Sequence, residues 1–341
     1  MCPTTGKLRQ VGQPLRDFEF DERDLRLLHA LQVRPRAPWA ALSSIVGADA
    51  VTLARRWAVL QDTGLAWMTS YRGSGASSVG AVVEISCIPS TLAGIVRDLA
   101  REREVITIDQ TAGSRDLVLS VLSASEAGLT TFLLERLATF AGITSIRTHR
   151  IIRIVTDAQH WRLKSLHDDE VSALERSVPQ PQPSKSVVTD SVEDELTRIL
   201  LIEGRASVSD LAQWLRISPA RAKSALSNIL GAQRVVVRLD IARTFSPWPV
   251  SVWYFLRVPP AKVDGVAAGL ARLDVARLVA TTGGQYSLVL SVWLRRVEDM
   301  AALERQLGER LPYVEIEDRS IVLRTPKHMG KRLYPDGRRI V

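Results

Sequence analysis

The sequence is poor in cysteine, and this scarcity excludes one class of protein. Its 341 residues include two cysteines, Cys2 and Cys87. A disulfide framework needs more cysteines at regular spacings, so we expect two free thiols. Long apolar runs are missing as well, since none reaches the roughly 18 residues that a membrane helix requires. Residues 1–17 lack the apolar core of a signal peptide, and we therefore expect a cytoplasmic protein.

Motifs of common catalytic sites are also missing. The sequence has no phosphate-binding Gly-x-x-x-x-Gly-Lys loop and no nucleophile elbow. Its histidines are scattered without the spacing of metal ligands: His29, His149, His160, His167 and His328. These gaps predict a protein that is not an enzyme and that needs no cofactor or metal.

What is present in excess is positive charge, and most of it lies at the C-terminal end. The net charge is +8. In residues 324–341 the basic side chains, opposed only by Asp336, are Arg324, Lys327, Lys331, Arg332, Arg338 and Arg339. Two interpretations stay open for this tail: contact with the phosphates of a nucleic acid, and a disordered solubilising segment.

The second half of the sequence repeats the first. Residues 113–121 return in similar form as residues 284–292, and residues 36–37 return as residues 205–206. The two offsets are nearly equal, which indicates that whole modules were copied in order. Because such a period is far longer than that of a solenoid repeat, each half should fold as its own unit.

Each half begins with three expected helices and a short extended wing. In the first half, one helix starts after Asp21, a good N-cap residue, and ends before Pro35. The next elements are helices at 40–46 and 50–62 and a wing at 65–71. From Val192 the same pattern restarts. Three short helices with a tight turn before the third are typical of a helix-turn-helix.

A β-α-β-β-α-β order follows the helices in each half. In the first half the expected elements are 79–86, 89–103, 105–112, 117–123, 126–140 and 143–155. This order predicts a ferredoxin-like sandwich. The fold class is therefore α+β, a winged helix-turn-helix plus a ferredoxin-like sandwich, and the pair occurs twice. The expected boundaries are 18–75 and 190–246 for the helix-turn-helix domains, 78–155 and 247–325 for the sandwiches, 156–189 for a linker and 326–341 for the basic tail.

The third helix of each set carries polar side chains suited to DNA. Thr52, Arg55 and Arg56 lie on or near its exposed face in the first half. In the second half the corresponding residues are Ser218, Arg221 and Lys223. Arginine at such a position contacts phosphates or a guanine edge. A solvated charged face is the alternative interpretation.

These residues resemble a known family. The pattern of Phe20, Asp21, Asp24, Leu27, Leu28, Leu31, Leu42, Arg55, Arg56, Leu60 and Gly64 is similar to the DNA-binding module of the Lrp/AsnC regulators. Gly204-Arg205-Ala206-Ser207 with Ile217-Ser218-Pro219 resembles the same module in the second half. The sandwich resembles the ligand-sensing domain of that family, which directly follows its helix-turn-helix.

The resemblance implies an effector site at a hairpin of each sandwich. In the family this hairpin carries a Gly-x-x-Asp turn that helps to bind an amino acid between sensing domains. The matching residues are Thr111, Gly113 and Asp116 in the first half and Thr282, Gly284 and Ser287 in the second. Serine replaces the acid in the second half, which predicts that only the first hairpin senses the ligand. A simple tight hairpin is the alternative for either turn.

The function expected from the resemblance is transcriptional regulation. The partners it implies are double-stranded DNA, an amino-acid effector and a second copy in a homodimer or higher oligomer. Two alternatives stay open: a siroheme-decarboxylase-like enzyme, and a scaffold with inactive helix-turn-helix domains. The enzyme is disfavoured because no histidine lies within residues 105–123 or 275–294, around the hairpins.

Overall fold

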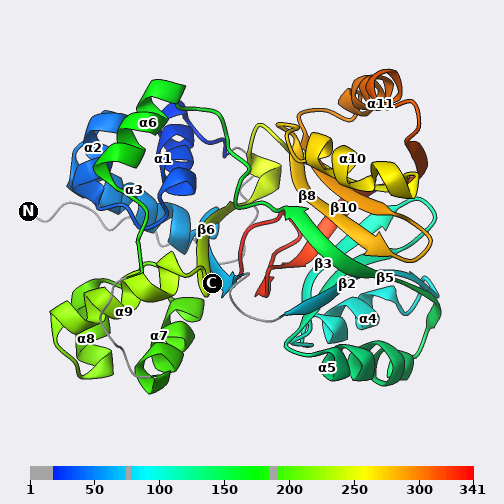
Figure 1. Cartoon of the computed structure of the whole chain (residues 1–341), viewed down its shortest axis with the longest axis horizontal. Coiled ribbons are helices and arrows are strands. Elements are labelled where there is room, and N and C mark those ends of the chain that lie inside the picture. The colour runs from blue at the N-terminus through cyan, green and yellow to red at the C-terminus, as the bar shows by residue number, and fades with distance from the viewer. Residues whose placement is uncertain (1–17, 74–77, 184–189) are drawn as a thin grey trace, which may run out of the picture.

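The computed structural model describes residues 18–73, 78–183 and 190–341. Cys2, the polar leader and the end of the expected linker lie outside these residues. The chain forms a helical module and a β-rich module, which stand side by side in Figure 1. Across the described ranges, no helix is both long and apolar enough to span a membrane.

The helical module contains two sets of three helices, each followed by a strand. The first set is α1 (Glu22–Val33), α2 (Trp39–Val46), α3 (Ala50–Asp62) and β1 (Ala66–Arg72). The second set is α7 (Asp190–Ile202), α8 (Val208–Leu215), α9 (Pro219–Gly231) and β6 (Val235–Ile241). As expected from the sequence, Asp21 caps α1, and it does so through a capping box. The structure adds a second cap, since Asp49 caps α3.

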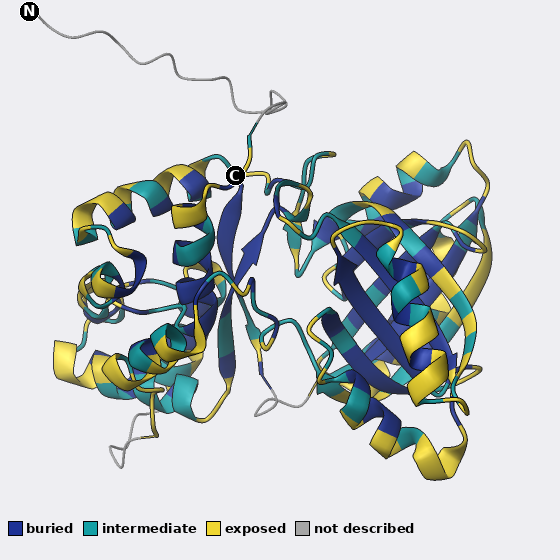
Figure 2. Cartoon of the chain, turned by 90° about the horizontal axis from the view of Figure 1, so that it is seen from above, coloured by how far each residue is buried: buried dark blue, intermediate teal, exposed yellow. Residues whose placement is uncertain are grey.

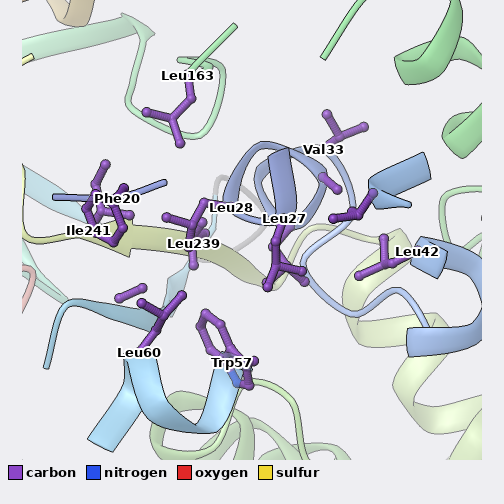
Figure 3. Close-up of a cluster of buried hydrophobic side chains, with 14 of the residues drawn as sticks. Phe20, Leu27, Leu28, Val33, Leu42, Trp57, Leu60, Leu163, Leu239 and Ile241 are labelled. Atoms are coloured by element: carbon purple, nitrogen blue, oxygen red, sulfur yellow. The ribbon is translucent and has the colours of Figure 1, made fainter. Parts of the chain in front are cut away.

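The strands β1 and β6 pair with each other in an antiparallel ribbon, which we call the ribbon. Its register matches Ala66 with Ile241 and Thr69 with Arg238. The two wings thus join the helix sets instead of standing free. Leu239 of β6 points into the core of the first set, beside Leu28 (Figure 3).

Two arginines reinforce this junction reciprocally. The Arg36 guanidinium donates to the carbonyls of Gly204 and Ala206, the latter at 2.6 Å. Arg205 donates to the carbonyls of Pro35 and Ala37, the latter at 2.9 Å. The two helix sets are therefore held in one fixed arrangement.

The β-rich module is a closed barrel, so the prediction of two separate sandwiches was wrong. Its strands are β2 (Val79–Cys87), β3 (Val105–Ala112), β4 (Leu117–Ser123), β5 (Ile143–Thr156), β7 (Val250–Arg257), β8 (Ala276–Gly283), β9 (Leu288–Leu294) and β10 (Glu315–His328). Within the described residues the strands follow each other as β10-β3-β4-β2-β5-β8-β9-β7, and β7 pairs again with β10. A lone sandwich would leave the edges β3 and β5 unpaired, and pairing them with β10 and β8 removes both edges.

Helices cover the outside of the barrel, and a second apolar layer fills its inside. The covering helices are α4 (Leu92–Leu99), α5 (Glu126–Thr131), α10 (Val263–Leu270) and α11 (Asp299–Arg310). Along β2, Ala81, Val83 and Ile85 belong to the core under the helices, whereas Val82 belongs to the inner core. This alternation follows the period of two of a strand, and Figure 2 shows the strands buried between exposed helices.

Residues 156–183 are more than the spacer expected from their sequence. They contain α6 (Asp168–Ser177), which packs on α1 and α2. Their buried apolar side chains are Trp161, Leu163, Leu166 and Leu174. These residues therefore cover the first helix set.

The C-terminal residues are folded, so the interpretation as a disordered tail was wrong. A short strand β11 (Lys331–Arg332) pairs with the end of β10. Lys327 is buried and donates to the carbonyl of Glu102 at 2.7 Å. The Arg339 amide donates to the carbonyl of Gly64 at 2.8 Å. The tail therefore ties the barrel to the first helix set.

Candidate functional site

A cavity of about 460 Å³ lies between the ribbon and one open end of the barrel. Its walls come from β1 and β6, from the inner faces of the barrel strands, and from residues 155–160 and 323–337. This volume falls within the roughly 300–1,000 Å³ of small-molecule sites. Because residues from both modules line it, a ligand here would contact the helical module and the barrel together.

Among the charged side chains of the lining, cations outnumber carboxylates. The arginines in it are Arg72, Arg238, Arg243, Arg277 and Arg324. The carboxylates in it are Asp109 and Asp157. With the histidines neutral, the lining carries a net charge of +3, which favours an anionic ligand.

One of these arginines is held by a buried carboxylate just behind the wall. Arg238 lies 3.2 Å from Asp240, and both side chains are almost fully buried. Burial alone would raise the pKa of Asp240, but Arg238, His328 and Arg277 hold that pKa well below its usual range. The cavity therefore keeps an ionised Asp240 as the counter-charge of Arg238.

Three other arginines of the lining have no such partner. Among the described residues, Arg72, Arg243 and Arg324 have no carboxylate within ion-pair distance. Burial also lowers the pKa of Arg243, because few groups compensate its charge there. A ligand carboxylate would supply the counter-ion that the protein does not provide.

Arg277 is sandwiched between aromatic rings. Its guanidinium lies 3.7 Å from the ring centre of Trp293 and 4.8 Å from that of Trp161. Burial lowers its pKa to about 9, so it remains charged at neutral pH. Its nearest carboxylate, Asp240, is 3.8 Å away.

Aromatic side chains supply flat apolar walls. Trp67 and Trp253 line the cavity, and Trp253 donates to Asp109 at 2.9 Å. Tyr71 donates its hydroxyl to Asp157 at 2.7 Å. The indole N–H of Trp67 is buried without a hydrogen-bond partner among the described residues. Flat walls with cations at their edges suit a planar polyanion.

Two histidines that looked scattered in the sequence meet at this cavity. His328 Nε2 lies 3.3 Å from Arg238 and 3.6 Å from Asp240. His160 lines the same cavity from residues 155–160. No local pattern around either histidine indicates that both line one cavity, because pairing of distant strands brings them there.

The six residues predicted to bind an effector do not line the cavity. Thr111 and Thr282 each donate a hydroxyl across their own hairpin, to the carbonyls of Arg115 and Tyr286, both at 2.9 Å. Gly113 and Gly284 have positive φ angles and form the turns.

The two residues that differ between the hairpins, Asp116 and Ser287, have the same structural role. The Asp116 carboxylate accepts from the Cys87 amide at 2.7 Å, and the Ser287 hydroxyl accepts from the Val258 amide at 3.1 Å. These contacts favour the simple-hairpin alternative. The expectation that only the first hairpin binds an effector therefore stays a prediction.

A histidine does lie beside one hairpin, contrary to the expectation from sequence. His149 of β5 packs against Gly284, because β5 pairs with β8 of the other half. Its Nε2 atom lies 2.5 Å from Glu84, which also pairs with the buried Arg115. Tyr286 packs on His149 with ring centres 4.8 Å apart. The local sequence of the hairpins contains no sign of this contact.

The residues predicted to bind DNA differ in their exposure and in their contacts within the protein. Thr52, Arg55, Arg221 and Lys223 are exposed on α3 and α9. Arg56 instead forms a two-pronged ion pair with the buried Asp24, one prong at 2.5 Å.

Ser218 caps α9 by accepting from the Arg221 amide at 3.3 Å. Arg56 and Ser218 therefore have structural roles, which the sequence pattern did not separate from DNA contacts.

Two family models match parts of the chain. The AsnC-type helix-turn-helix domain matches residues 20–61, and the Lrp/AsnC ligand binding domain matches residues 80–160. The chain thus contains both of these domains, over less than half of its length. Among curated proteins, no sequence matches this chain.

Solved structures of similar fold extend over nearly the whole chain. The crystal structure of the siroheme decarboxylase NirDL has 13% identity and a TM-score of 0.52, covering 91% of this chain and 93% of that one. The same enzyme in co-complex with an iron-uroporphyrin III analogue has 14% identity, a TM-score of 0.51 and the same coverage. AsnC of E. coli has 21% identity and a TM-score of 0.36, covering 40% of this chain and 94% of its own.

These matches correct the expectation that the chain is not an enzyme. That expectation depended on missing catalytic motifs and on hairpins without histidine. The fold that the two halves build together is similar to that of an enzyme, the siroheme decarboxylase NirDL, over 91% of the chain. At such low identity the likeness concerns the fold alone.

Proposed function

We propose that this chain is an enzyme that binds a planar polycarboxylate of the tetrapyrrole class and removes carboxyl groups from it. The observation that carries this proposal is the cavity, whose walls are aromatic and whose lining has a net charge of +3. The fold shared with the siroheme decarboxylase NirDL adds support.

The arrangement of charges fits a substrate with several carboxylates. Arg72, Arg243 and Arg324 offer guanidinium groups without a counter-ion among the described residues. Charge-assisted bonds from arginine to carboxylate are strong and directional. Several such anchors would fix the ring in one orientation and leave one acidic side chain at the reaction position.

The proposed chemistry needs one proton and no electrons. The bond between the side-chain carbon and its carboxylate breaks, carbon dioxide leaves, and that carbon takes up a proton, so that an acetate group becomes a methyl group. His328, at the cavity wall beside Arg238 and Asp240, is our candidate to deliver this proton. The macrocycle, with any iron that it carries, is substrate in this scheme.

Binding tests this proposal directly. We expect iron-uroporphyrin III to shift its absorbance spectrum on titration with the protein and to bind with micromolar or tighter affinity. Replacing Arg243 and Arg324 together by methionine should weaken binding by at least about 100-fold, since each lost anchor costs about 1.5–3 kcal/mol. An absorbance spectrum that stays unchanged at high protein concentration would show that the cavity does not bind this tetrapyrrole, and would contradict the proposal.

We also propose that the two halves are tandem copies that share one barrel. Support comes from matching bounds, since α8, α9 and β6 begin at 208, 219 and 235, and α2, α3 and β1 at 39, 50 and 66. Each pair of starts is 169 residues apart. The expected domain boundaries are kept in this proposal, with the two sandwich domains as the halves of the barrel.

A second candidate function is transcriptional regulation, favoured by the AsnC-type helix-turn-helix match at residues 20–61. In this alternative the exposed Arg55, Arg221 and Lys223 contact double-stranded DNA, and a ligand in the cavity acts as the effector.

Selection of bound DNA from a random pool tests this alternative. Enriched sites that are lost when Arg55, Arg221 and Lys223 are all replaced by alanine would support it. The control is Arg198→Ala, which removes an exposed arginine of α7 outside the third helix of either set. No enrichment, with or without iron-uroporphyrin III, would contradict it.

A further inference from the structure

The two helix sets differ in one respect that the proposed function does not use. In the first set, the face formed by α1 and α2 is covered by residues 161–178, which include α6. In the second set, no described segment covers the corresponding face of α7 and α8. The comparison depends on the matched element bounds and not on the proposed activity.

Burial shows the difference at matched positions. Val33 on α1 is 6% exposed, whereas Ile202, 169 residues later on α7, is 80% exposed. Ile45 on α2 is 9% exposed, whereas Trp214 at the same offset on α8 is 53% exposed. Large apolar side chains left open in this way mark an interaction surface. We call the face with Ile202 and Trp214 the α7–α8 face.

The cover on the first set shows which contacts such a face makes. Leu163 and Leu174 are buried in the core of the first set. The Gln32 side chain accepts from the Leu163 amide at 2.8 Å, and His29 Nδ1 accepts from the Leu166 amide at 2.8 Å. The face thus takes an apolar segment that continues into an amphipathic helix.

Ion pairs fix the position of that covering helix. Arg26 contacts Glu170 at 2.6 Å, and Arg34 contacts Glu175 at 3.2 Å. These pairs join two basic residues of the face to two acidic residues of α6. The two acidic residues are five positions apart.

The α7–α8 face has the opposite charge at the matched positions. Glu195 stands at the offset of Arg26, and Glu203 stands at the offset of Arg34. Glu203 is exposed and interacts electrostatically with the partly buried Arg36 and Arg205. Glu195 pairs at 2.9 Å with Arg198 on its own helix, a surface pair that contributes little. A helix with basic residues in place of Glu170 and Glu175 would complement this face.

We propose that the α7–α8 face is the docking site of a partner protein's amphipathic helix, which covers Ile202 and Trp214 and places two basic residues near Glu195 and Glu203. The partner helix is the counterpart of α6, with its charge reversed.

A peptide made from this chain is a suitable probe. The peptide has the sequence of residues 161–178 with Glu170→Lys and Glu175→Lys, and the unmodified sequence is its matched control. We expect the charge-reversed peptide to bind the full-length protein about tenfold more tightly than the control, measured by fluorescence anisotropy at low salt. Equal affinities of the two peptides would contradict the charge argument.

Protein variants locate the binding site. Ile202→Ser with Trp214→Ser should abolish binding of the charge-reversed peptide. Val59→Ser is the control, because Val59 is an exposed apolar side chain on α3. Iron-uroporphyrin III binding and circular dichroism check that each variant is folded. Peptide binding that survives the double substitution would overturn the proposal.

Light scattering separates a partner from a second copy of the chain. A concentration-dependent dimer that the Ile202→Ser, Trp214→Ser variant loses would show that a second copy occupies the face, and this result would also overturn the proposal. A molar mass that stays constant over the same concentration range, together with selective binding of the charge-reversed peptide, supports the proposal. None of these outcomes depends on decarboxylation.

Discussion

Arg277 has a pKa well below the usual range of arginine. Burial lowers its pKa to about 9, and a bound carboxylate would favour the charged form. Affinity for iron-uroporphyrin III should therefore be constant near neutral pH and fall as the pH rises through about 9, because the guanidinium then loses its proton. Absorbance titrations across this range measure the effect.

The Arg277→Met variant is the matched test of this assignment. It should bind about 10- to 100-fold more weakly at pH 7 and lose most of the pH dependence near 9, because one charge-assisted contact is gone. Arg55→Met, which changes an exposed side chain on α3, should bind as the wild type does. An unchanged pH profile in Arg277→Met would assign the titration to another group.

His29 links pH to the stability of the first helix set. It is buried, and burial lowers its pKa to about 4. Its neutral ring accepts from the amides of Ser165 and Leu166. Because the folded pKa lies below the unfolded value of about 6.5, the unfolded chain binds the extra proton first. Stability should fall by up to about 3 kcal/mol as the pH drops from 6.5 to 4.

Chemical denaturation at several pH values tests this account. His29→Gln keeps an acceptor atom but cannot titrate, so its stability should change less over the same range. If the wild type and His29→Gln show the same slope, carboxylates elsewhere cause the loss.

At the scale of elements, the reciprocal contacts of Arg36 and Arg205 hold the two helix sets together. Arg36→Ala removes two bonds to the carbonyls of Gly204 and Ala206. We expect faster amide hydrogen exchange in α1, α7 and the ribbon, with unchanged exchange in the barrel strands. Arg198→Ala, an exposed change on α7, is the control. Uniformly faster exchange throughout the chain would show that the two modules unfold as one unit.

The sequence predicted the elements well where local chemistry determines them. Asp21 caps α1 where expected, and Pro219 begins α9. The strands 105–112 and 117–123 have the expected bounds. Caps, turns and apolar periods act within a few residues, so one sequence contains their signal.

The pairing of elements could not be predicted in the same way. Strand β5 joins β8, and β10 joins β3, between residues more than 100 positions apart. No local pattern specifies which edge a strand will pair with. The sandwiches were therefore expected to be separate, and the ribbon of β1 with β6 was missed.

At the scale of the whole molecule, the cavity is a product of those long-range pairings. Arg238 comes from the ribbon, Arg277 from the barrel, and His160 from the segment between β5 and α6. Isolated in the sequence, each resembles an ordinary surface or core residue. The candidate site predicted from sequence, at the hairpins, followed a family resemblance, whereas the cavity became visible only when the two halves had closed into one barrel.

The measurement that tests the central claim most directly is product analysis with siroheme as substrate. Three samples are incubated with siroheme without oxygen: the wild type, the double variant with Arg243→Met and Arg324→Met, and a protein-free control. The tetrapyrroles are then identified by mass spectrometry. We expect products that have lost carbon dioxide with the wild type, and at least tenfold fewer with the variant. Siroheme that binds in the cavity but keeps all its carboxyl groups would contradict the enzyme proposal and leave a ligand-binding protein.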